Sequence, residues 1–193
     1  MRTSPAQPAA SEPVHTSWPA PDSARRYGSV SRFFHWGMAL CFALVFAAAL
    51  AHYFAKDSAL DQLLWQAHKP VGALLFLLWI LRATWALLHA RQRPPHVNLA
   101  AHLGHLALYA LMLAVPAIAL LRQYGSGRAF APFGIPLMQG HEDKIAWMTE
   151  LGSLLHGELG WVLLALVAGH IGMALWHRRP GHTNVLPRML GKP

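Results

Sequence analysis

The sequence predicts an all-α integral membrane protein built as a four-helix bundle. Of its 193 residues, 54% are hydrophobic and only 12% are charged, and the mean hydropathy is +0.30. An ordinary soluble domain has about 25% charged residues. Four apolar stretches are each long enough to cross a hydrocarbon core about 30 Å thick. Thirteen histidines accompany them, which is an unusual number for a chain with so few charged side chains.

Four spans account for most of the chain, and only one of the linkers between them is long. The predicted spans are residues 33–54, 63–88, 99–121 and 153–177. The second span contains only Lys69 and Arg82 as charged residues, near its two ends, where such side chains can reach the interface. Pro116 should kink the third span without ending it, because neighbouring helices can satisfy the freed carbonyl. The linker 122–152 is expected to carry a short surface helix near residues 144–151.

The chain is expected to have two parts. Residues 1–30 are rich in Pro, Ala and Ser and have no apolar core, which indicates a disordered tail and not a secretory signal. Residues 31–190 form the four-helix membrane domain. The single cysteine, Cys41, lies in an apolar run, so no intrachain disulfide can form.

The distribution of basic residues predicts how the bundle is oriented. Four spans place both termini on one face of the membrane, called side A, together with the linker at 89–98. Side A carries 11 of the 16 Lys and Arg residues. The others lie on the opposite face, side B: Lys56, Lys69, Arg122, Arg128 and Lys144. Basic loops favour the cytoplasm, so side A, with the tail and both termini, should be cytoplasmic. No nucleic-acid partner is expected, because no basic run is interleaved with exposed aromatics.

Histidines at two depths suggest paired ligands. His156 and His170 are 14 residues apart in the last span. This spacing is roughly 1400° of helical rotation, so both rings leave one helix face, about 21 Å apart. His35 lies near the side A end of the first span, and His68 lies near the side B end of the second. Matching by depth predicts two pairs, His35 with His170 and His68 with His156.

Two imidazoles that face each other across a bundle suit a haem iron with two axial ligands. The sequence contains no C-x-x-C-H, so covalent attachment is excluded and two non-covalent haem b groups per chain are expected. His68 and His156 are each followed four residues later by a glycine, Gly72 and Gly160, which leaves room for a porphyrin edge. Two alternatives stay open: a membrane histidine can simply hydrogen-bond a neighbouring helix, and glycine also serves close helix packing.

Other histidines are less well placed for this role. His52 lies 17 residues from His35, which is roughly 100° away from the helix face of that ring. His102 and His105 are spaced three apart near side A. Such a pair suits a metal, a substrate, a structural contact or a haem propionate. His177 lies at the cytoplasmic end of the last span.

These features together resemble the bacterial cytochrome b561 family of di-haem membrane proteins. The resemblance covers about residues 27–190. Its motifs are Arg32-Phe-Phe-His35-Trp36, His68-x-x-x-Gly72, Ala101-His102-Leu-Gly-His105, the His156…His170 spacing followed by His177, and a terminal Leu186-Pro187-Arg188-Met189. Each motif is short, and their order and spacing make the resemblance specific. The tail at 1–30 is a departure that touches no motif.

The resemblance implies a function as well as a fold. The axial ligands would be His35, His68, His156 and His170, and electrons would pass across the bacterial inner membrane. Some members resemble a superoxide oxidase, which takes an electron from superoxide at the periplasmic face and reduces ubiquinone. In those proteins the position that matches His177 lies beside the quinone.

On this interpretation the side B haem accepts electrons from a periplasmic donor, either superoxide or a redox partner protein, and the side A haem passes them to ubiquinone. Lys69, Arg122 and Arg128 would attract an anionic donor or pair with propionates, unless they are simply solvated residues that flank the helices. Membrane lipid is a partner in every case.

Two other functions remain as hypotheses. One is a haem-b anchor subunit for electron transfer in a larger dehydrogenase or hydrogenase. The other is a histidine-lined metal transporter. The transporter is disfavoured because it predicts carboxylates beside the histidines, and only Glu158 qualifies.

Overall fold

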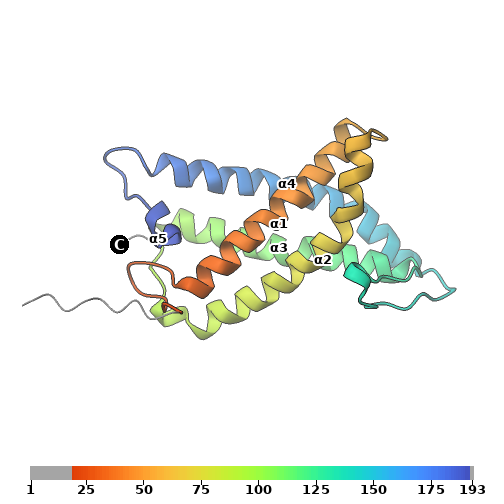
Figure 1. The fold of residues 1–193 in the computed structure, drawn as a ribbon, viewed down its shortest axis with the longest axis horizontal. Helices are drawn as coiled ribbons and strands as arrows, with labels where there is room; N and C mark the ends of the chain where they lie inside the picture. The colour runs from red at the N-terminus through yellow and green to blue at the C-terminus, as the bar shows by residue number, and fades with distance from the viewer. Residues whose placement is uncertain (1–18, 192–193) are drawn as a thin grey trace, which may run out of the picture.

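A computed structural model describes residues 19–191, and within them the predicted all-helical fold is confirmed. Four long helices run in chain order: α1 (Ser29–Phe54), α2 (Ala59–Leu88), α3 (Leu99–Gly125) and α4 (Ala146–Trp176). A short helix, α5 (Leu186–Leu190), follows them, and two 3₁₀ turns, η1 (Ala90–Gln92) and η2 (Pro132–Gly134), lie in the linkers. Figure 1 shows the four long helices running between the two ends of the molecule, with α1 crossing the others obliquely.

Each of the four long helices is long and apolar enough to cross a membrane. The most apolar stretch of each helix is mostly uncovered by protein, since only 6–22% of its residues are buried inside the bundle. Large apolar side chains such as Leu81, Leu113 and Ile171 are among the exposed ones. A soluble protein rarely leaves so continuous an apolar surface in water. Lipid is therefore the solvent that covers the outer faces of these helices.

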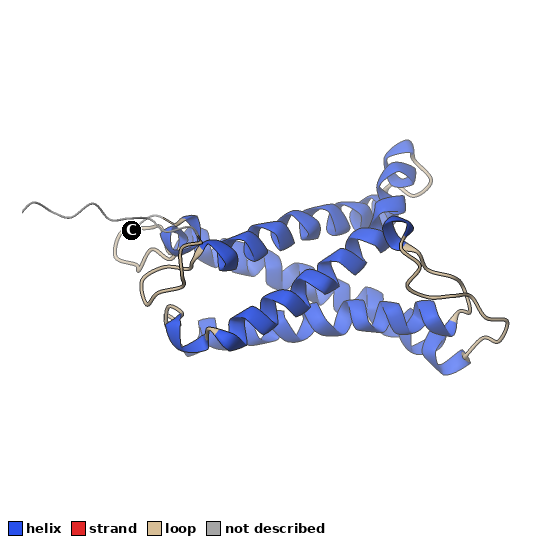
Figure 2. Cartoon of the chain, turned by 60° about the horizontal axis from the view of Figure 1, so that its bottom comes forward, coloured by secondary structure: helices blue, strands red, loops and turns tan. Residues whose placement is uncertain are grey.

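The helices pack as two hairpins. α1 packs on α2, α3 packs on α4, and a smaller contact joins α2 to α3. Loops lie at both ends of the bundle (Figure 2). The start of α1, η1 and α5 gather at one end, which corresponds to side A (Figure 1). The α1–α2 turn and the linker 126–145 lie at the other end, side B.

Local signals explain most of the helix ends. The Ser58 hydroxyl caps α2 by accepting from the Asp61 amide at 3.1 Å, and the Asn98 side chain caps α3 by accepting from the Ala101 amide at 2.8 Å. α3 continues through Pro116, as the sequence predicted. α4 begins at Ala146, earlier than the predicted residue 153, so the short helix expected near residues 144–151 is the first part of α4.

Two glycines allow α3 and α4 to approach closely at side B. A Cβ atom on Gly125 would collide with the Met148 side chain, and one on Gly152 would collide with the side chain of Arg122. Close approach at small residues is a common way for membrane helices to associate. This packing supports the first turns of α4, which the sequence predicted as a separate short helix.

An apolar core fills the middle of the bundle. All four long helices contribute to it: Met38, Cys41, Phe42, Leu75, Leu108, Met112, Val115 and Leu163. Met38 is 1% exposed and Leu163 is 3% exposed. Leu163 lies midway in sequence between His156 and His170. The core therefore separates the two depths at which the paired histidines lie.

A hydrogen-bonded loop closes the side A end. The buried Asp22 carboxylate accepts from the Gly28 amide at 2.6 Å, from the Ser31 hydroxyl at 2.8 Å and from Nε of Arg93 at 3.3 Å. The indole of Trp85 donates to the Ser31 hydroxyl at 3.2 Å. The predicted tail overlaps this ordered part, since residues 19–28 form the loop and α1 begins at Ser29. Residues 1–18 of the predicted tail lie outside the described residues.

The short helix α5 is tied back to the same end. The Trp36 indole donates to the Met189 carbonyl at 3.1 Å, and the Arg32 guanidinium donates to the Leu190 carbonyl at 3.1 Å. Arg188 in turn donates to the Pro95 carbonyl at 3.0 Å, in the linker before α3. The C-terminal segment thus connects the start of α1 to the α2–α3 linker.

Candidate functional site

The structure brings together both histidine pairs that the sequence predicted. The ring centres of His35 on α1 and His170 on α4 are 6.3 Å apart, with an interplanar angle of 65°. Those of His68 on α2 and His156 on α4 are 6.2 Å apart, with an angle of 85°. All four rings are half-buried. α4 therefore supplies one imidazole to a pair at each depth.

Both separations fit a single metal ion held between two imidazoles. A metal–imidazole bond of about 2.0–2.1 Å, extended on either side by half the width of a ring, spans roughly 6.3 Å between ring centres. Direct van der Waals stacking would bring two rings closer together and more nearly parallel, as the 3.8 Å separation of His52 and Trp65 shows. Each pair is thus edge-to-face, at a separation that also lets two imidazoles bind one metal ion between them.

Hydrogen bonding also suits ligation. Nδ1 of His156 lies 3.0 Å from the Val115 carbonyl oxygen of α3. A carbonyl only accepts, so Nδ1 carries the proton and Nε2 keeps its lone pair for a metal. Nδ1 of His35 is buried and lacks a hydrogen-bond partner within the described residues, whereas the Val45 backbone of α1 is a weak partner of His68.

A cleft of about 810 Å³ lies beside the side B pair and fits a flat prosthetic group. Its walls include His68, His156 and three glycines, Gly72, Gly157 and Gly160. A Cβ atom at any of these glycines would meet nothing within 4 Å. The missing side chains therefore leave open space next to His68 and His156. For Gly72 and Gly160 this space agrees with the porphyrin-edge interpretation, and not with close helix packing.

The five basic residues assigned to side B all line this one cleft: Lys56, Lys69, Arg122, Arg128 and Lys144. The described lining residues include no Asp or Glu. None of the five cations forms an ion pair with a carboxylate within residues 19–191. The Lys69 ammonium instead donates to the Gln123 side-chain oxygen at 3.1 Å. Although the Asp61 carboxylate lies behind His52 and interacts with Lys56, the cleft carries an excess of positive charge, which favours an anionic occupant or visitor.

A second histidine group lies at side A. The ring of His105 is 5.4 Å from that of His170, and the ring of His96 is 4.4 Å from that of His102 and 5.6 Å from that of His105. Desolvation lowers the pKa of His96, and the neighbouring His102 ring adds to this effect, so His96 is neutral at pH 7. Across the described part of the chain, no group of three or more His, Cys, Asp or Glu is arranged to hold a metal ion.

His177 lies at the C-terminal end of α4, near side A. It is two helical turns beyond His170 and so faces a similar direction from the helix axis. Its Nδ1 donates to the Met173 carbonyl at 2.7 Å, and its ring centre is 5.9 Å from that of His182. This bond leaves Nε2 free to contact a small molecule at the end of the bundle.

The sequence did not predict the side chains that pack against His68 of the side B pair. His52, at the end of α1, bonds the Asp61 carboxylate at 3.0 Å and stacks on Trp65 at 3.8 Å. Trp65 in turn stacks on His68 at 4.9 Å. The short turn between α1 and α2 was the available signal, because it forces His52 and Asp61 to lie side by side.

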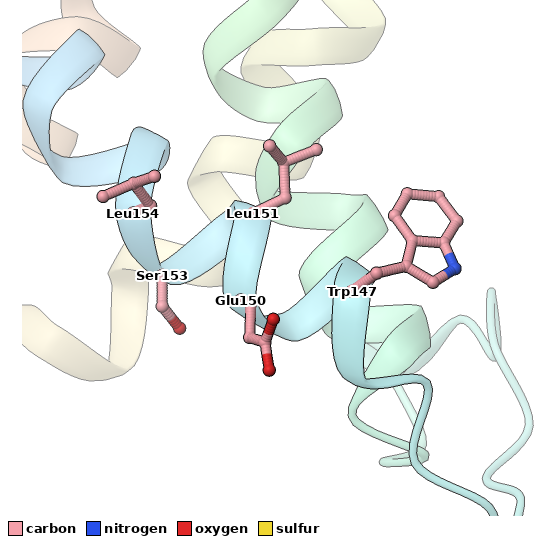
Figure 3. A pocket seen from close by; sticks show the side chains of 5 residues that line it. All are labelled: Trp147, Glu150, Leu151, Ser153 and Leu154. Carbon is pink, nitrogen blue, oxygen red and sulfur yellow. The ribbon is translucent and has the colours of Figure 1, made fainter.

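A second hollow on side B is formed by one helix alone. Figure 3 shows its lining side chains along the first turns of α4: Trp147, Glu150, Leu151, Ser153 and Leu154. These residues include no imidazole and no cation. The hollow therefore lacks the ligand donors and the positive charge that distinguish the large cleft.

Facing imidazole pairs at two depths of a membrane bundle, one of them beside a porphyrin-sized cleft, define the class as a haem-binding membrane cytochrome. The family model for prokaryotic cytochrome b561 matches residues 26–192. Cytochrome b561 homolog 2 of Escherichia coli (strain K12) is 30% identical over 181 residues, which cover 89% of this chain and 94% of that protein. Cytochrome b561 homolog 1 of the same strain is 27% identical over 177 residues, which cover 86% and 97%.

The chain therefore belongs to the prokaryotic cytochrome b561 family, and the resemblance read from the sequence is confirmed. Family membership makes it a transmembrane b-type haem protein of electron transfer in a bacterial membrane.

Proposed function

We propose that the chain holds two haem b groups and moves electrons across the inner membrane between them. His68 and His156 would hold one haem at side B, and His35 and His170 would hold the other at side A. The observation that carries this proposal is the pair of ring separations, 6.2 and 6.3 Å, at two depths of one bundle. Bound haem supplies one-electron chemistry, and two histidine ligands would leave no iron position open for direct oxygen binding.

The charge at side B supports a small anionic electron donor. The cleft beside His68 and His156 collects all five side B cations without a carboxylate among its described lining residues. A focused positive potential raises the rate at which an anion arrives, and the effect weakens as salt increases. Superoxide is such an anion, and loss of one electron converts it to dioxygen.

The side A end supports ubiquinone as the electron acceptor. His177 has its Nδ1 engaged with Met173 and its Nε2 free. As an imidazolium it can donate to a quinone carbonyl, and as a neutral ring it can accept from a quinol hydroxyl. Two superoxide ions supply two electrons, and the quinone takes these together with two protons to form quinol.

The basic asymmetry of the chain supports a cytoplasmic side A, with both termini in the cytoplasm and the cationic cleft in the periplasm. The donor would therefore be oxidised outside the cell and the quinone reduced at the inner leaflet. Lipid surrounds the bundle, and a redox protein at side B is the alternative donor.

Mixing the purified holoprotein with superoxide and a soluble ubiquinone tests this function. We expect rapid quinone reduction without added protein. Replacing Arg122 and Arg128 by Gln should lower the rate severalfold and flatten its salt dependence, because steering charge is lost. The matched control is Arg91→Gln, which removes an exposed cation at side A. Quinone reduction that requires a further protein would contradict the proposal and support the anchor-subunit alternative.

A further inference from the structure

Four side chains form a continuous column from the α1–α2 turn to the side B histidine pair. The Asp61 carboxylate bonds Nδ1 of His52 at 3.0 Å. The ring of His52 stacks on Trp65 with centres 3.8 Å apart and an interplanar angle of 12°. Trp65 stacks on His68 with centres 4.9 Å apart and an angle of 29°. The Trp65 indole therefore packs against one face of the His68 ring, and the His52 ring packs against the Trp65 indole.

The far end of this column is fixed by the backbone of the turn. Asp61 is only 4% exposed. The backbone amide of Asp57 donates to the Asp61 carboxylate at 2.9 Å. The backbone amide of Asp61 donates to the Ser58 hydroxyl. Asp57 adopts a left-handed conformation with φ of 64°, which Asp accepts more readily than most non-glycine residues, and this lets the chain turn within four residues between α1 and α2. The carboxylate thus has one defined position from which to orient His52.

The two side B histidines differ in what orients their rings. His156 is fixed by its hydrogen bond to the Val115 carbonyl. The backbone of Val45 on α1 is a hydrogen-bond partner of His68, but the buried Nδ1 forms no hydrogen bond as well aligned as that of His156. Metal-binding histidines usually have the second nitrogen engaged, and that bond sets the ring plane. For His68 the stacked indole adds a second restraint on the ring plane to this weaker backbone contact.

We propose that Trp65, held by His52 and Asp61, is a positioning residue that fixes the ring plane of His68. This inference rests on the proposed role of His68 as an axial ligand. Ligand orientation is one of the levers by which a protein adjusts a haem centre. Loosening the column should therefore change the electronic signature of the side B haem and leave the side A haem unchanged.

A merely space-filling role makes a different prediction. Trp65 and His52 both line the large cleft, so a smaller side chain could simply weaken haem retention. In that case the haem that remains bound would keep its spectrum. Electron paramagnetic resonance of the oxidised holoprotein separates the two roles, since the low-field g value of a low-spin haem responds to the relative orientation of its two imidazoles.

The experiment compares wild type with Trp65→Leu, Trp65→Phe and Asp61→Asn. His68→Ala identifies which low-spin signal belongs to side B. We expect Trp65→Leu to shift the low-field g value and the midpoint potential of that signal alone. Trp65→Phe, which retains an aromatic face, should shift both less, and Asp61→Asn should shift them although it does not touch His68. The matched control is Trp85→Phe, which removes an indole of the same helix stacked at 3.8 Å on His89 and should move nothing at side B.

Side B signals at the wild-type position in Trp65→Leu would overturn the inference. If Trp65→Leu fails to retain the side B haem, Trp65→Phe and Asp61→Asn decide, and unshifted signals in both would overturn it equally. Wild-type protein that lacks two low-spin signals would instead overturn the proposed function.

Discussion

Gly160 is the residue whose size we expect to decide whether the side B pair can hold a haem. It lies one turn beyond His156, lines the cleft, and has no atom within 4 Å of the position of a Cβ. A methyl group fits this space, whereas a phenyl ring would occupy the cleft. We therefore expect Gly160→Ala to keep the wild-type haem content and Gly160→Phe to lose the side B haem.

Haem-to-protein ratio and low-spin signals of the two purified variants measure this effect. The side A signal serves as an internal control, because Gly160 is more than two turns from His170. Full haem content in Gly160→Phe would show that the open space is not the haem site.

Contacts between residues could be predicted where they depend only on helical periodicity and on depth in the membrane. The pairing of His35 with His170 and of His68 with His156 followed from positions along straight helices, and the rings do lie together. The column that ends on His68 was missed. Its contacts depend on rotamers and on a four-residue turn, and periodicity describes neither of these.

At the scale of elements, the side A loop depends on one buried carboxylate. Asp22 compensates the guanidinium of Arg93 and accepts from Ser31 and Gly28. Replacing it by Asn keeps the shape but removes the charge. We expect Asp22→Asn to lower the free energy of unfolding by about 2–3 kcal/mol, since a mostly buried Arg93 then lacks its anion.

Thermal unfolding in detergent measures this loss as a lower melting temperature. Arg91→Gln is the control, since its exposed side chain has no hydrogen bond or ion pair among residues 19–191. A melting temperature equal to wild type in Asp22→Asn would show that the network does not stabilise the loop.

The contact of α3 with α4 depends on Gly125. A Cβ at this position would collide with Met148, so Gly125→Ala must separate the two helices or displace that side chain. We expect a destabilisation of about 1–3 kcal/mol, typical of overpacking. Thermal unfolding measures this loss, and the control is Gly104→Ala on the same helix, where a Cβ atom would have open space and the backbone is helical. Equal stability of Gly125→Ala and wild type would contradict the packing argument.

Element boundaries were predictable where a cap or an uninterrupted apolar run marked them, as for α3 between Asn98 and Gly125. The start of α4 was not, because its first turns are stabilised by close packing at Gly152 and carry no sequence cap. The docking of α5 was also hidden, since Trp36 and Arg32 bind main-chain carbonyls that have no sequence signature.

At the scale of the whole molecule, charge asymmetry predicts the orientation. Reporter fusions that are active on only one side of the membrane test it. A fusion at the C-terminus should report the cytoplasm, and one inserted in the loop 126–145 should report the periplasm. The opposite pattern would place the cationic cleft in the cytoplasm and remove a periplasmic anion as the donor.

The most direct test of the central claim is the haem content of four single-ligand variants, measured by reduced-minus-oxidised spectra and haem-to-protein ratio. The account predicts two low-spin haems per wild-type chain. His35→Ala and His170→Ala should each remove the same haem, while His68→Ala and His156→Ala should each remove the other. Wild-type protein without an α-band would contradict the account. So would a series in which His35→Ala and His68→Ala abolish the same component.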